Sequence, residues 1–165
     1  MRRTAELGLM LALALILSYV ESLIPFSFGM IPGIKLGLPN LIVLLLLYEK
    51  PNTVGEREAL LVNVLRIVLS GFLFSNLYAI LYALAGAAFS FSAMLLGRRS
   101  KRLSMIGVSV LGGVFHNVGQ LLVAMAVVET LAVAYYVPFL IVAGTVTGAV
   151  LGIAGTTLMP YLRRT

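Results

Sequence analysis

The chain has 165 residues, of which 61% are hydrophobic and 11% are charged, and it carries a formal net charge of +6 without a single cysteine. Soluble domains are about 45–50% apolar and about 25% charged, so this composition excludes an ordinary globular domain and a disordered chain and predicts an integral membrane protein. The lack of cysteine excludes a disulfide framework, an iron–sulfur centre and a thiol nucleophile.

Six apolar segments follow one another along the chain, and a membrane-spanning helix needs roughly 20 such residues. We place the segments at residues 7–23, 33–48, 59–74, 77–96, 103–128 and 136–158. The second begins between residues 33 and 36, and it is short unless residues 30–35 also enter the membrane. The pattern predicts an all-α bundle of six transmembrane helices. Residues 1–165 form a single integral membrane domain, because the loops are too short for a second core.

Charge placement predicts the topology. With six spans, the two termini and the second and fourth loops share one side of the membrane. That side carries ten of the twelve basic residues, whereas Lys35 lies on the other side and Arg66 lies within a span. Basic residues gather on the cytoplasmic side, so we expect a multi-pass protein of the cell membrane with both termini in the cytoplasm. The same placement explains the basic composition without a nucleic-acid partner.

The first segment also has the basic start and the apolar run of a secretory signal peptide. No A-x-A-like cleavage site follows it, and Glu21 and Pro25 come next. We therefore interpret this segment as a retained helix.

Arg66 lies in the middle of the third segment. Ionisable residues inside spans are costly, and they default to functional hypotheses. Asn63, Arg66 and Ser70 share one face of a helix, and that face should point into the bundle. Two interpretations are about even: the guanidinium holds an anionic or carbonyl-rich ligand, or it pairs internally with Glu21 or with backbone carbonyls.

The fifth segment carries His116, Asn117 and Gln120 at a depth similar to that of Arg66. His116 and Gln120 are four residues apart and share a face. The chain has no second histidine, so His116 is more typical of a hydrogen-bonding residue than of a metal ligand. Polar groups from two helices at one level favour a ligand pocket over an inert network between helices.

The outer ends of the helices carry further polar residues. We predict that Arg66, His116, Asn117 and Gln120 form the floor of an outward-facing pocket and that Lys35 and Asn40 line its mouth. The glycine- and proline-rich stretch 26–40 is either a re-entrant segment that lines this pocket or a simple outer loop. Glu129 is interpreted as a solvated end of the fifth helix. The predicted ligand-binding residues are Glu21, Lys35, Asn40, Asn63, Arg66, His116, Asn117 and Gln120.

Several catalytic signatures are missing from the sequence. There is no Walker A motif, and without any aspartate there is no aspartate-rich diphosphate motif. Serines near His116 are not sufficient evidence for a catalytic nucleophile and base. We therefore expect no enzyme, assign no catalytic residue and no metal site, and leave any cofactor unidentified.

The stretch Pro32-Gly-Ile-Lys-Leu-Gly-Leu-Pro-Asn40 resembles the P-G-x-K-L-G-L-x-N signature of the Gx transporter family, which is also described as heptaprenyl diphosphate synthase component I. Arg66, His116-Asn117 with Gln120, and Tyr136 with Pro138 also resemble that family. The resemblance implies a six-helix protein similar to the substrate-binding S components of energy-coupling factor transporters. Such components bind a vitamin-like ligand from outside, while a coupling membrane protein and ATPases drive its release inside.

The resemblance implies a membrane substrate-binding and transport protein energised by partner subunits. Its ligand would be a small isoprenoid- or flavin-related molecule, with an anionic group as one option. Two alternatives stay open. One is a membrane subunit associated with a soluble heptaprenyl diphosphate synthase and menaquinone synthesis, and the other is a subunit for flavin- or quinone-linked electron transfer.

Overall fold

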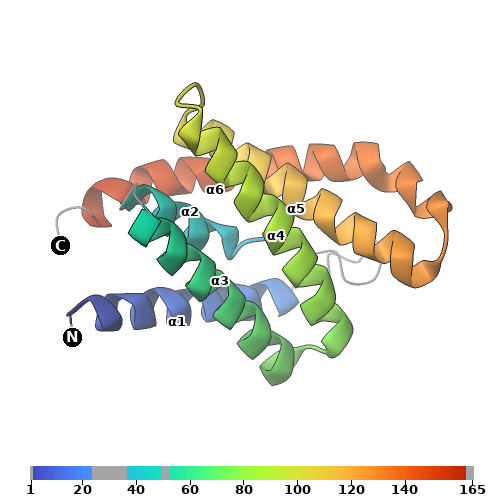
Figure 1. Ribbon diagram of the computed structural model, residues 1–165, viewed down its shortest axis with the longest axis horizontal. Coiled ribbons are helices and arrows are strands. Elements are labelled where there is room, and N and C mark those ends of the chain that lie inside the picture. The colour runs from blue at the N-terminus through green and yellow to red at the C-terminus, as the bar shows by residue number, and fades with distance from the viewer. Residues whose placement is uncertain (1, 24–36, 50–52, 163–165) are drawn as a thin grey trace.

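The computed structural model describes residues 2–23, 37–49 and 53–162. Its elements are α1 (Arg2–Leu23), α2 (Asn40–Glu49), α3 (Thr53–Phe74), α4 (Leu77–Arg99), α5 (Met105–Val128), the short 3-10 helix η1 (Leu131–Tyr136) and α6 (Val137–Leu162). Helices and no strands make up the described part of the chain, which confirms the predicted all-α class (Figure 1).

Four stretches are long and apolar enough to cross a membrane, namely α1, α4, α5 and the continuous stretch Leu131–Leu162. These stretches fit a membrane protein. α2 has only 10 residues, and at about 1.5 Å per residue it reaches roughly half of the 30 Å hydrocarbon core. α3 has 22 residues but begins with charged ones. The count of six complete spans therefore stays a prediction.

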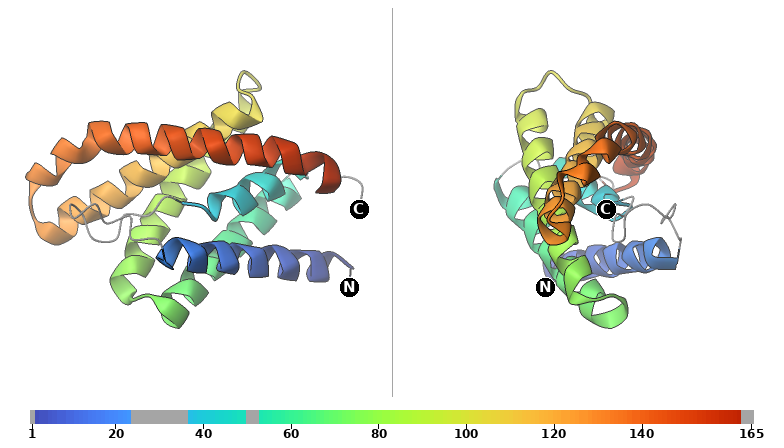
Figure 2. Two further views of the ribbon diagram at one scale, coloured as in Figure 1. Left: turned by 180° about the vertical axis from the view of Figure 1, so that it is seen from behind. Right: turned by 90° about the vertical axis from the view of Figure 1, so that its right-hand side faces the viewer.

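The short helix α2 lies at the centre of the bundle. Its sequence is apolar on every side, and Ile42 to Leu47 are all buried, as expected for a helix without a polar face. α1 and α6 lie on opposite sides of α2 in both the front and the rear view (Figures 1 and 2). α2 packs closely on α3 and α6, whereas α1 packs mainly on α3.

Ion pairs gather the charged helix ends at one end of the bundle. The Arg3 guanidinium donates to Glu49 at 2.9 Å and to Glu58 at 2.9 Å, and so joins the start of α1 to the end of α2 and the start of α3. Arg98, in the last turn of α4, contacts the Glu56 carboxylate and the Leu47 carbonyl. The start of α1, the end of α2, the start of α3 and the end of α4 thus share one end, the same grouping that the charge pattern predicts for one side of the membrane.

Glycines allow α5 and α6 to pack backbone to backbone. A Cβ atom on Gly113 would lie 2.3 Å from the Gly144 carbonyl oxygen, and one on Gly148 would lie 2.6 Å from the Val110 Cα. Such contacts tolerate no side chain, and small residues are how membrane helices reach this distance. The Asn117 side chain adds a hydrogen bond from Nδ2 to the Leu140 carbonyl at 2.9 Å. The four-residue glycine repeat of α6 is therefore a packing face within the bundle.

Candidate functional site

The polar face of α3 is buried in the bundle. Asn63, Arg66 and Ser70 are 1%, 5% and 7% exposed. Arg66 donates from Nε to the Asn63 Oδ1 at 3.0 Å. Its Nη2 has no hydrogen-bond partner among the residues that the structure describes. A buried guanidinium with an unmet donor is costly, because a protein interior does not solvate it as water does.

A closed polar cavity adjoins this guanidinium. The cavity lies between four helices and the α3–α4 turn, and its lining is Ser18, Glu21, Arg66, Ile67, Ser70, Gly71, Ser75, Ala79, Ile80, Ala83, His116 and Gln120. The volume that the centre of a water molecule can occupy in the cavity is about 10 Å³. This is room for roughly one water molecule. The structure thus brings Glu21, Arg66, His116 and Gln120 together around one small void.

The cavity extends toward the end of the bundle away from the ion pairs. Ser75, in the α3–α4 turn, is exposed and also lines the cavity. Gly71 and Ile80 pack tightly along this path, because a Cβ atom on Gly71 would lie 2.0 Å from the Ile80 Cγ1. Gly71 and Ile80, which both line the cavity, thus bring α3 and α4 into contact between Arg66 and the α3–α4 turn.

Glu21 ties the start of the described segment 37–49 to α1. Its Oε1 accepts hydrogen bonds from the backbone N–H of Gly37 and, at 3.4 Å, from that of Leu38. Glu21 also attracts the Arg66 guanidinium electrostatically. This attraction is compatible with both roles that the sequence left open for Arg66, internal pairing with Glu21 and ligand binding.

Gly86 on α4 leaves space for the side chains of His116 and Gln120, which line the cavity. A Cβ atom on Gly86 would lie 2.9 Å from the His116 Nδ1 and 2.9 Å from the Gln120 Cγ. Ala83, one turn earlier on α4, lines the cavity itself. No pattern in the sequence indicates that Gly86 lies against these two polar side chains.

The other predicted site residues lie elsewhere. Asn117 packs on α6 through its bond to Leu140 and is not part of the cavity lining. Asn40 donates from Nδ2 to the Ser90 Oγ at 3.3 Å, and Gly37, at φ +79°, lies between Asn40 and His116. Lys35 lies outside the described residues.

Two polar lining residues, Ser18 and Ser75, were missed by sequence reasoning. Ser18 is one helical turn before Glu21 on α1, and this spacing could have indicated a shared face. Ser75 carried no such signal, because a serine in a short turn is ordinary. Within the described ranges, no group of three metal-ligating side chains is present.

A family model described as heptaprenyl diphosphate synthase component I matches residues 10–158. No curated protein and no solved structure matches the chain.

Proposed function

We propose that this chain, which belongs to the heptaprenyl diphosphate synthase component I family, is a substrate-binding membrane protein that captures a small anionic molecule in the cavity around Arg66. The observation that carries the proposal is a guanidinium only 5% exposed whose Nη2 lacks a hydrogen-bond partner among the described residues. Keeping such a cation at this depth is expensive, so its presence favours a binding role. Guanidinium groups match carboxylates and phosphates in geometry.

The lining fits a ligand with one anionic group and a less polar body. Ser70, His116 and Gln120 line the cavity with hydrogen-bonding side chains, while Ile67 and Ala83 form an apolar part of its wall. Isoprenoid- or flavin-related molecules have this mixed character. Because the cavity has room for about one water, a ligand of that size requires α3 and α4 to separate where Gly71 meets Ile80.

The ligand enters from the outer face in this proposal. The cavity reaches Ser75 at the α3–α4 turn, and that turn lies at the end opposite the ion pairs of Arg3 and Arg98. The charge pattern predicts the ion-paired end to be cytoplasmic. Since the sequence has no Walker A motif, release would be energised by partner subunits, as in S components of energy-coupling factor transporters.

Native mass spectrometry of gently purified protein tests the binding role. We expect the wild-type protein to carry a co-purifying small anion that Arg66→Gln loses. Arg57→Gln is the matched control, because Arg57 is an exposed arginine on the same helix. Equal retention of the anion by Arg66→Gln and by the wild type would reject the site.

The entry side has a separate test, because the chain lacks cysteine. Ser75→Cys and Ser100→Cys each introduce one thiol at an exposed position at opposite ends of α4. We expect a membrane-impermeant maleimide to label Ser75→Cys in intact cells and Ser100→Cys only after permeabilisation. The reverse pattern would place the cavity on the cytoplasmic side.

The family description favours a second candidate function, a membrane subunit that works with a soluble prenyl diphosphate synthase. This candidate requires a complex with the synthase, which affinity purification from native membranes would detect by its catalytic activity. A third candidate, flavin- or quinone-linked electron transfer, requires visible absorbance in the purified protein. Binding at Arg66 without either property supports the first proposal.

A further inference from the structure

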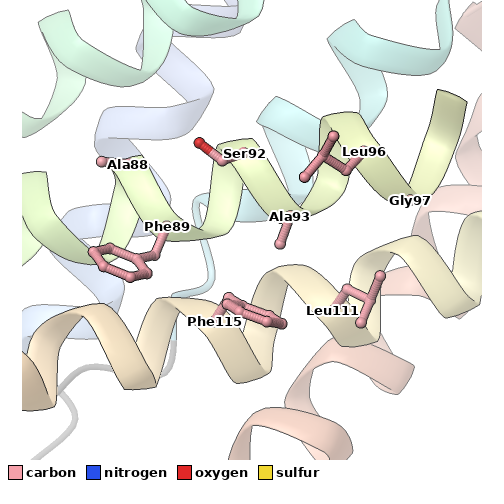
Figure 3. Close-up of a pocket in the computed structure, with 8 residues that line it drawn as sticks. All are labelled: Ala88, Phe89, Ser92, Ala93, Leu96, Gly97, Leu111 and Phe115. Carbon is pink, nitrogen blue, oxygen red and sulfur yellow. The ribbon is translucent and has the colours of Figure 1, made fainter.

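A second hollow lies outside the polar cavity, in a furrow of about 550 Å³ between α4 and α5. Its walls include Phe89, Ala93, Leu96 and Gly97 from α4 and Leu111 and Phe115 from α5. Figure 3 shows Phe89 and Ala93 turned toward Phe115 and Leu111. Phe89, Leu96 and Phe115 are 41%, 68% and 40% exposed, so the furrow opens outward, where a membrane would present hydrocarbon chains.

The shape of the furrow follows from side-chain size. Ala93 and Gly97 are small residues one helical turn apart on α4, and larger apolar side chains flank them. Gly97 allows Leu111 to pack against the α4 backbone, since a Cβ atom on Gly97 would lie 2.9 Å from the Leu111 Cδ1. The result is an apolar trough along the two helices, of a kind that accommodates an extended hydrocarbon chain.

Positive charge stands at one end of this trough. Gly97 is followed directly by the basic last turn of α4, and then by Lys101 and Arg102 in the α4–α5 turn. Arg99, Lys101 and Arg102 are exposed. Arg98 and Arg99 contact Glu56, whereas the side chains of Lys101 and Arg102 contact no acidic group in the described part of the chain.

Membrane topology alone accounts for basic residues in this turn, but it does not account for an apolar trough that ends beside them. Hydrocarbon next to exposed cations complements a lipid whose headgroup is anionic, and basic clusters at the cytoplasmic end of helices recognise such headgroups.

We infer that the α4–α5 furrow binds an anionic phospholipid of the bilayer. One acyl chain lies between Phe89 and Leu111, and the phosphate lies at Lys101 and Arg102. This site is separate from the cavity around Arg66, so it does not depend on the proposed function.

Native mass spectrometry with two lipids of identical chains tests the headgroup. Phosphatidylglycerol and phosphatidylcholine are supplied in equal amounts to the purified, delipidated protein. We expect the wild-type protein to retain phosphatidylglycerol preferentially. In the variant Lys101→Gln/Arg102→Gln, the preference should fall by roughly fivefold for each charge removed. Arg57→Gln, which removes an exposed cation away from the furrow, should keep the preference.

A second set of variants tests the chain site. Ala93→Leu fills the trough while the basic turn stays intact, and it should lower phosphatidylglycerol retention severalfold. Ala126→Leu is the control, because Ala126 is an exposed alanine on α5 that does not line the furrow. If Ala93→Leu fails to fold, Ala88→Leu takes its place, since Ala88 is exposed and lines the same furrow.

Three results would overturn the inference. One is equal retention of the two lipids by the wild type, and another is the same loss of preference in Arg57→Gln as in the double variant. The third is a different occupant: stronger retention of a polyprenyl phosphate than of phosphatidylglycerol, or a dimer that Ala93→Leu abolishes.

Discussion

The α5–α6 interface and the cavity beside α3 are built on opposite principles. Between α5 and α6, glycines bring the backbones into direct contact, and the Asn117 amide donates to the Leu140 carbonyl. Around the cavity, polar side chains from separate helices meet at a small void, and the Arg66 Nη2 has no partner in the described part of the chain. Tight packing stabilises a fold, whereas unmet polar groups cost stability and are characteristic of functional sites.

Breaking the tight interface should have the largest effect on stability. Gly113→Ala places a methyl group 2.3 Å from the Gly144 carbonyl oxygen, so α5 and α6 must move apart. Overpacking of this kind costs about 1–3 kcal/mol or more, and thermal unfolding in detergent should show a clearly lowered midpoint. Gly8→Ala is the control, because nothing lies within 4 Å of a Cβ atom there. Equal midpoints for the two variants would contradict the packing role.

Removing the buried charges at the cavity should leave the unfolding midpoint unchanged or raise it, in contrast to Gly113→Ala. Arg66→Met combined with Glu21→Gln deletes both charges, while the glutamine oxygen can still accept from the Gly37 N–H. Replacing buried charges with neutral groups of similar volume is often neutral or stabilising by about 1–4 kcal/mol. We therefore expect an unchanged or higher unfolding midpoint together with loss of the bound anion. A fall in the unfolding midpoint as large as that of Gly113→Ala would show that the two charges stabilise the fold.

A substitution at Asn117 tests whether this residue serves the α5–α6 interface or the cavity. Asn117→Leu removes the hydrogen bond to the Leu140 carbonyl, and such bonds between membrane helices average about 0.6 kcal/mol, with a maximum near 1.7. We expect a small drop in the unfolding midpoint and normal ligand retention by native mass spectrometry. Loss of the ligand without a change in the unfolding midpoint would show that Asn117 contributes to ligand binding.

The sequence predicts the apolar part of α1, α3 and α4 better than the charged ends of these helices. The segment at residues 59–74 ends where α3 ends, at Phe74, but α3 begins six residues earlier, at Thr53. Likewise α1 begins at Arg2 and α4 continues to Arg99. Hydropathy identifies only the apolar part of a helix. The helices continue beyond it, where ion pairs such as Arg3 with Glu6 and Arg98 with Glu56 hold their ends.

Helical periodicity also identified the buried face of α3 but could not separate neighbours on α5. His116 and Asn117 are about 100° apart on a helix of 3.6 residues per turn, so they cannot both point into one cavity. Which of them faces the cavity depends on where α6 packs, and the glycines of α6 bring it against the Asn117 side. The packing of Ile80 on Gly71 is likewise a contact between two helices, which the pattern of a single helix cannot predict.

The contact between Gly71 and Ile80 allows a direct measurement of access to the cavity. Ser70→Cys places the chain's first thiol in the cavity lining. Because the cavity has room for about one water, a small methanethiosulfonate reagent should label it slowly. Adding Ile80→Ala removes the side chain against Gly71 and should accelerate labelling severalfold. Ser109→Cys, buried where α5 meets α6, should stay unlabelled in both backgrounds. If Ile80→Ala leaves the Ser70→Cys rate unchanged, the route to Arg66 does not pass between α3 and α4.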